Sequence, residues 1–169
     1  MEEQMRNLNK NDNPFPWNDS SIVEEAYQGN NYQIVETGFR TNRCIIFFSG
    51  NGLYYPNNQD VFLDVVCKRD RYEWKKVAQN KKIREYFEKI IFVRDIYKQW
   101  YIKGTGSNNS SIKAVLDLLK ENTENMQLTT CGNSAGGYMA TLMGSLLGAS
   151  MFFLFPASLI YGIKLRKVR

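Results

Sequence analysis

An uninterrupted apolar run, CIIFF at residues 44–48, constrains the fold of this chain more than any other feature. A strand with apolar residues on both faces must be covered on both faces, as strands are in a parallel sheet between helices. The run stops at Ser49-Gly50-Asn51-Gly52, which is typical of a turn. The segment therefore predicts a central strand of an α/β sheet.

Two later apolar runs, at residues 90–93 and 151–155, repeat this pattern, and residues 128–131 are a further predicted strand. Helical segments separate them, so strands and helices alternate as they do in a parallel α/β sheet. A chain of 169 residues is nevertheless short for the complete sheet of an open α/β enzyme. We therefore expect one α/β domain over residues 21–163, with a mainly parallel sheet that is incomplete at its C-terminal end.

Three segments carry helix signals. Residues 72–90, YEWKKVAQNKKIREYFEKI, space their apolar side chains for one amphipathic helix. Residues 110–122, SSIKAVLDLLKEN, combine a serine cap with an apolar face. The apolar residues 138–147 predict a third helix, which directly follows a glycine-rich turn.

The flanking segments are predicted from their local composition. Residues 1–20 are rich in asparagine and contain two prolines, which predicts an irregular lead-in. Residues 31–39, NYQIVETGF, alternate as an exposed strand, and the turn after them predicts a hairpin with the strand at 44–48. Residues 164–169 form a basic tail.

Composition argues against several classes of function. The net charge is +5, but 22 Lys and Arg are interspersed with 17 Asp and Glu, which disfavours nucleic-acid binding. Cys44, Cys67 and Cys131 are odd in number and lack metal-ligand spacing, so no disulfide, metal or bound cofactor is expected. The N-terminus lacks the basic and apolar regions of a secretory signal, so we expect a cytoplasmic protein.

The five residues GNSAG, 132–136, match the pattern G-x-S-x-G, which holds a serine on a tight turn between a strand and a helix. In this interpretation Ser134 is the catalytic nucleophile, and the N–H of Ala135 points at a developing oxyanion at the helix N-terminus. The elbow glycines are then Gly132, Gly136 and Gly137. The alternative is a purely structural turn where a helix packs closely on a strand.

A second oxyanion donor is expected from the loop after an earlier central strand. Gly50, Asn51 and Gly52 lie directly after the 44–48 strand, in the required order along the chain. An ordinary turn is the alternative, because Asn-Gly is a common turn sequence.

With these motifs in place, the chain resembles the α/β-hydrolase superfamily over roughly residues 31–157. The resemblance rests on FFSGNG after one strand, RD with WYIKGTGS after the next, and CGNSAGG after the third. Within that superfamily, IIFFSGNG, YEWKK, FVRDIYKQWY and GNSAGGYMA are similar to bacterial capsular or surface polysaccharide O-acetyltransferases. The resemblance implies a three-layer fold and an acylated serine, Ser134. It also implies acetyl-CoA as an acyl donor and a carbohydrate hydroxyl as acceptor, or water in an esterase.

The chain departs from this family because it contains no histidine. A serine hydroxyl normally needs an imidazole base oriented by a carboxylate, and in the family both partners follow the serine along the chain. A complete triad is therefore absent, which we interpret as a C-terminal truncation that impairs activity.

Other residues are candidates for a substitute base or for contacts with substrate. Asp95 ends a predicted strand, but a structural or substrate-orienting role fits it better than direct catalysis. Lysines offer a second kind of base, but a solvated role is expected for Lys103, Lys113 and Lys120. Trp100 and Tyr101 could bind a sugar ring, but packing is the expected role for these two residues and for Trp74 and Tyr138.

An alternative function follows from the C-terminal third, which has no charged residue between Ala135 and Ile163. An apolar edge strand at 151–155 would invite another surface to bind. The second hypothesis is therefore an inactive remnant that binds a membrane surface through its C-terminus, or a protein in a homo- or hetero-oligomer. Gly148 and Pro156 interrupt the stretch, which argues against a membrane span.

Overall fold

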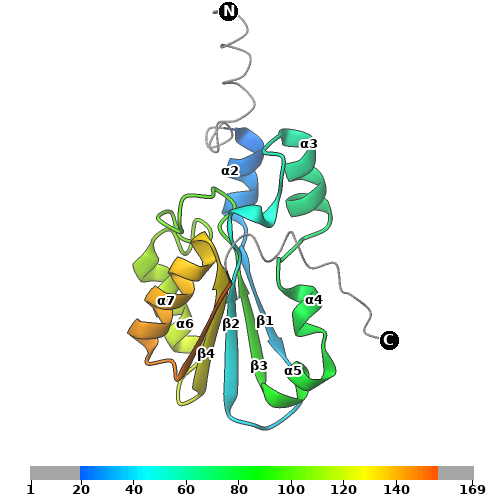
Figure 1. The fold of residues 1–169 in the computed structure, drawn as a ribbon. Coiled ribbons are helices and arrows are strands. Elements are labelled where there is room, and N and C mark those ends of the chain that lie inside the picture. The colour runs from blue at the N-terminus through cyan, green and yellow to red at the C-terminus, as the bar shows by residue number, and fades with distance from the viewer. Residues whose placement is uncertain (1–19, 156–169) are drawn as a thin grey trace, which may run out of the picture.

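The computed structural model describes residues 20–155. The basic tail at 164–169, almost all of the predicted lead-in and the part of the apolar C-terminus beyond Phe155 lie outside these residues. Figure 1 shows a twisted sheet with helices on both of its sides. Within residues 20–155, no helix is long and apolar enough to cross a membrane.

The sheet has five strands in the order β1-β3-β2-β4-β5. β2, β3, β4 and β5 are mutually parallel, and β1 runs antiparallel to β3. The strands are β1 Tyr32–Glu36, β2 Arg43–Phe48, β3 Lys89–Val93, β4 Gln127–Asn133 and β5 Met151–Phe155. The prediction of an α/β fold is confirmed at this level, with a mixed sheet in which parallel pairs dominate.

The predicted hairpin between the 31–39 strand and the 44–48 strand is wrong. β1 pairs with β3, and Ile34 lies opposite Ile91. β2 occupies the centre of the sheet between β3 and β4, where both of its edges are already paired. A strand whose two edges are both paired cannot also accept a hairpin partner, so β1 joins the sheet beyond β3.

Two helices cover one face of the sheet, α6 Ile112–Asn122 and α7 Ala135–Leu147. The Ser111 hydroxyl accepts the N–H of Ala114 at 3.1 Å, which is the cap that the sequence predicts. Apolar side chains of both helices pack against the alternate residues Cys44, Ile46 and Phe48 of β2. This cluster is the main core, and it fixes the start of α7 against the centre of the sheet.

Shorter helices, α4 Lys75–Ala78 and α5 Lys81–Tyr86, cover part of the opposite face. The single helix predicted for residues 72–90 is therefore wrong. Asn80 adopts an extended conformation, and its side chain accepts the N–H of Lys82 at 2.9 Å. It therefore caps the start of α5 and separates α5 from α4. Trp74 and Phe87 from this layer pack against Ile45 and Phe47 of β2.

A third layer of short helices lies beyond the carboxyl ends of the parallel strands (Figure 1). It comprises α2 Ser21–Gln28, a 3₁₀ turn at Asn51–Leu53, α3 Gln59–Phe62 and a π-helical segment at Leu63–Lys68. Its apolar side chains form a separate buried cluster that includes Leu53, Phe62 and Ile96. This layer borders the edge of the sheet at which β4 meets α7.

Candidate active site

Ser134 lies between the end of β4 and the first residue of α7, and its side chain is exposed. Its backbone has φ 48° and ψ −123°, a conformation that residues other than glycine rarely adopt. Such a conformation costs about 1–3 kcal/mol and persists only where the surrounding structure imposes it. This backbone conformation turns the chain sharply between β4 and α7, and Ser134 lies exposed on the surface.

Two of the predicted elbow glycines are needed because the backbone is crowded on both sides of the turn. A Cβ added to Gly136 would lie 2.3 Å from the carbonyl oxygen of Phe48. One added to Gly132 would lie 2.2 Å from the carbonyl oxygen of Gly136. Gly137 is different, because its Cβ would meet nothing closer than 3.5 Å. The first turn of α7 is therefore pressed directly onto β2 and β4.

Free backbone N–H groups lie beside the serine. Ala135 is the first residue of α7, and the first N–H groups of a helix have no acceptor within the helix. The first turn closes through the N–H of Tyr138, which donates to the carbonyl of Ser134 at 3.0 Å. The helix dipole adds partial positive charge at this end, so the site suits a developing negative charge.

The predicted oxyanion loop lies next to the elbow, but its amides are not equivalent. A Cβ on Gly50 would lie 2.7 Å from the carbonyl oxygen of Asn133, the residue before Ser134. The N–H of Gly50 donates to Glu73 Oε2 at 2.7 Å, so it is already occupied. Asn51 and Gly52 begin the 3₁₀ turn, and their N–H groups have no partner within residues 20–155. They are the loop amides left as candidate oxyanion donors.

Glu73 is a site residue that the sequence does not reveal. Its carboxylate accepts the N–H of Gly50 and also the side-chain amide of Asn133 at 3.2 Å, so one side chain joins the loop after β2 to the elbow. Asn133 is 3% exposed, and its Oδ1 has no hydrogen-bond partner among residues 20–155. No local pattern marks Glu73, because its partners lie 23 and 60 residues away in the sequence.

Within residues 20–155, no side chain hydrogen-bonds to the Ser134 hydroxyl. Asp95 follows β3 at the same edge, but it is 5% exposed and accepts the backbone N–H groups of Tyr97, Gln99 and Tyr101. Burial raises the pKa of the Asp95 carboxyl above its usual value, and these N–H groups act in the opposite direction. Asp95 therefore stabilises the conformation of the loop that follows β3.

Lys98 is a second buried ionisable group near this edge. It is 2% exposed, and its ammonium group donates to the carbonyl of Tyr54 and to Asn57 Oδ1. Burial lowers the pKa of Lys98 to about 8, although Asp95 and Glu73 oppose the shift. Its hydrogen bonds tie it to the layer above the sheet. The lysines named in the sequence analysis, Lys103, Lys113 and Lys120, are exposed.

The aromatic residues near the site divide into two groups. Tyr101 is fully buried, and its hydroxyl donates to the carbonyl of Ser49 at 2.8 Å. Trp74 is 6% exposed and donates its indole N–H to the carbonyl of Phe48 at 3.0 Å. Trp100 and Tyr138 are 45% and 49% exposed and touch edge to face, with ring centroids 5.7 Å apart. Packing explains the first pair, whereas the second pair is largely open to solvent.

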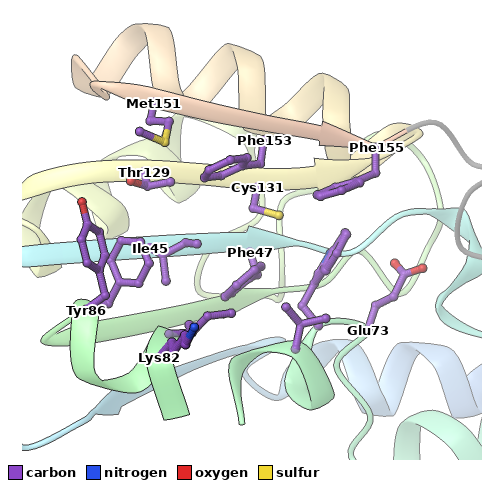
Figure 2. Close-up of a pocket in the computed structure, with 14 residues that line it drawn as sticks. Ile45, Phe47, Glu73, Lys82, Tyr86, Thr129, Cys131, Met151, Phe153 and Phe155 are labelled. Atoms are coloured by element: carbon purple, nitrogen blue, oxygen red, sulfur yellow. The ribbon is translucent and has the colours of Figure 1, made fainter. Parts of the chain in front are cut away.

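A pocket of about 730 Å³ lies on the face of the sheet opposite α7 (Figure 2). Apolar side chains of β2, β4 and β5 form one wall, and α4 and α5 form the other. The rings of Trp74 and Phe155 meet at a centroid distance of 5.4 Å and join the two walls. Because Phe155 is the register partner of Asn133, this contact closes the end nearest the elbow. Ser134 does not line this pocket.

The candidate site thus combines an exposed hydroxyl on a strained turn with free amides from α7 and from the loop after β2. Preorganised N–H groups of this kind stabilise the oxyanion of a tetrahedral intermediate. Among residues 20–155, no side chain is hydrogen-bonded to the Ser134 hydroxyl as a general base would be. No protein-family model, no curated protein and no solved structure matches this chain.

Proposed function

We propose that this chain carries the nucleophile and oxyanion part of a serine-dependent acyl-transfer site of the α/β-hydrolase type. The acceptor is a carbohydrate hydroxyl in an O-acetyltransferase reaction or water in an ester hydrolysis. The observation that carries the proposal is the backbone of Ser134, whose positive φ at the junction of β4 and α7 exposes the hydroxyl beside free N–H groups. Strained backbone of this kind is concentrated at functional sites.

The proposed chemistry has two steps. Ser134 Oγ attacks the carbonyl carbon of an acyl donor such as acetyl-CoA, its proton passes to a base, and the donor's thiol leaves after taking up a proton. The acceptor hydroxyl then attacks the acyl-serine and gives up its proton, and Ser134 regains one. In both steps the amides of Ala135 and Asn51 would hold the oxyanion.

The base is the part that this chain does not supply as an imidazole, because it has no histidine. A second copy of the same chain cannot supply one either. An imidazole base would therefore have to come from outside these 169 residues. A serine that lacks its base is expected to react slowly.

The test is labelling of the folded full chain with a fluorophosphonate, with and without added imidazole. We expect slow labelling that added imidazole accelerates, because the free base replaces the missing one, and peptide mapping should place the adduct on Ser134. Ser134→Ala should abolish the adduct. Ser145→Ala is the matched control, since Ser145 is also exposed on α7 but stands in ordinary helix. Folded protein that stays unlabelled in imidazole would contradict the proposal.

A second candidate function is an interaction module without catalysis, and β5 is the observation that favours it. Met151, Phe152, Phe153 and Leu154 are 41–53% exposed on β5, which is an edge strand of the sheet formed by residues 20–155. Exposed apolar edges are sites of strand pairing or membrane contact. If Ser134 is inert in imidazole while Phe153→Lys abolishes self-association or vesicle binding of the full chain, this candidate replaces acyl transfer.

A further inference from the structure

The loop after β3 contains an unusual concentration of strained backbone. Lys98, Trp100 and Tyr101 all have positive φ, at 54°, 57° and 63°. For bulky residues such values are true outliers, and each costs about 1–3 kcal/mol. A conformation this unfavourable requires specific contacts that hold it.

Buried hydrogen bonds on both sides of Trp100 provide those contacts. The Asp95 carboxylate accepts the N–H of Gln99 at 2.7 Å and that of Tyr101 at 2.9 Å. These bonds fix the backbone immediately before and after Trp100. The Tyr101 side chain is fully buried and donates its hydroxyl to the carbonyl of Ser49. Trp100 itself takes no part in these bonds, so the loop does not need an indole in order to fold.

The strained conformation places Trp100 on the surface beside the candidate nucleophile. Its ring meets the ring of Tyr138 edge to face at 5.7 Å, and nearly half of each side chain stays exposed. Tyr138 lies one helical turn after Ser134 and bonds to its carbonyl. This backbone hydrogen bond, 3.0 Å long, places the aromatic pair within one helical turn of Ser134.

The chemistry of this surface selects among ligands. An acyl chain would be favoured by an enclosed apolar pocket, whereas the two rings are open to water on one side. A ring with an apolar C–H face and hydroxyls at its edge can cover the aromatic surface while its hydroxyls remain in water or reach the free loop amides. A pyranose has these properties, and it also presents a hydroxyl for acylation.

We propose that Trp100 and Tyr138 form a platform that binds a pyranose ring of the acyl acceptor next to Ser134. This inference rests on the proposed acyl-transfer function. The platform sets which acceptor the site takes, while the serine and the amides carry out the transfer. The acceptor is a saccharide with an exposed hydroxyl.

The experiment uses the full chain labelled with 5-fluorotryptophan, whose three resonances correspond to Trp17, Trp74 and Trp100. The probes are maltohexaose and an N-acetylglucosamine hexamer, titrated to millimolar concentration. We expect the Trp100 resonance to shift on titration while the Trp74 resonance stays unchanged. Binding should weaken at least tenfold in Trp100→Ala and in Tyr138→Ala, and it should largely persist in Trp100→Phe.

Tyr86→Ala is the matched control, because Tyr86 is also half exposed but lines the pocket on the other face of the sheet. Its saccharide affinity should equal that of the wild type. Absence of a Trp100 shift with both saccharides, or equal affinity in Trp100→Ala, would overturn the platform.

The two proposals fail in different ways. Fluorophosphonate labelling of Ser134 without saccharide binding overturns the platform and leaves acyl transfer standing. Saccharide binding without labelling overturns acyl transfer, and the acceptor role of the platform falls with it.

Discussion

Replacing Gly136 with alanine tests whether the crowded elbow holds Ser134 in place. The added Cβ would lie 2.3 Å from the Phe48 carbonyl oxygen and 2.8 Å from the Ser49 carbonyl carbon, and both atoms belong to backbone that cannot swing away. Overpacking of a core costs about 1–3 kcal/mol, and a clash with backbone belongs at the upper end of that range. Alanine recovers about 1 kcal/mol of helix propensity. We therefore expect a net loss of about 2 kcal/mol.

Gly137→Ala is the control, since it makes the same change one residue later in the same helix. Its Cβ meets only ordinary contacts, at 3.5 Å and beyond, so propensity alone should add about 1 kcal/mol of stability. Urea unfolding should thus separate the two variants by about 3 kcal/mol, and the melting temperature of Gly136→Ala should fall by about 4–8 °C. Equal stabilities would refute the claim that close packing of α7 on β2 shapes the elbow.

Three further changes test other parts of the site. Ser134→Gly should be about 1 kcal/mol more stable to urea than Ser134→Ala, because glycine adopts a φ of 48° without strain, and equal values would deny the strain. Glu73→Ala should lose about 2 kcal/mol, because it leaves the Gly50 N–H and the Asn133 amide unpaired, and Glu73→Gln should lose less; wild-type stability in Glu73→Ala would deny the bridge. Burial raises the pKa of the Cys131 thiol from 9.0 to about 12, so across this window the folded state keeps a proton that the unfolded state releases, and stability falls as pH rises. Unfolding at several pH values should show that Cys131→Ala makes this fall shallower by about 1.4 kcal/mol per pH unit, and unchanged slopes would contradict the assignment.

Periodicity predicted the central strands and α6 because those elements are defined by local pattern and by burial. Strand pairing is not local, which is why the partner of β1 was missed: the alternation in YQIVE shows that a strand forms but not which neighbour it joins. The prediction of one helix across residues 72–90 was wrong for a different reason. Asn80 favours a cap over a helix interior, and this preference outweighed the apolar spacing around it.

The candidate site was predictable only as far as its motif extended. The residues GNSAG indicated the turn at Ser134, because three small residues in that spacing meet a steric need that the structure displays at Gly132 and Gly136. Glu73 could not be found in this way, since its two partners come together only after folding. The exposure of Trp100 was equally hidden, because it follows from hydrogen bonds to Asp95 rather than from the hydropathy of its own segment.

The hydrogen bonds that Asp95 accepts determine how this surface can change during evolution. They hold the backbone on either side of Trp100 and do not involve its side chain. The conformation of the loop is therefore independent of which side chain residue 100 carries. A substitution at residue 100 alters what the loop displays without altering the path of the chain. In the proposed platform, a single replacement at residue 100 therefore changes the surface offered to the acceptor while the fold of the loop is kept.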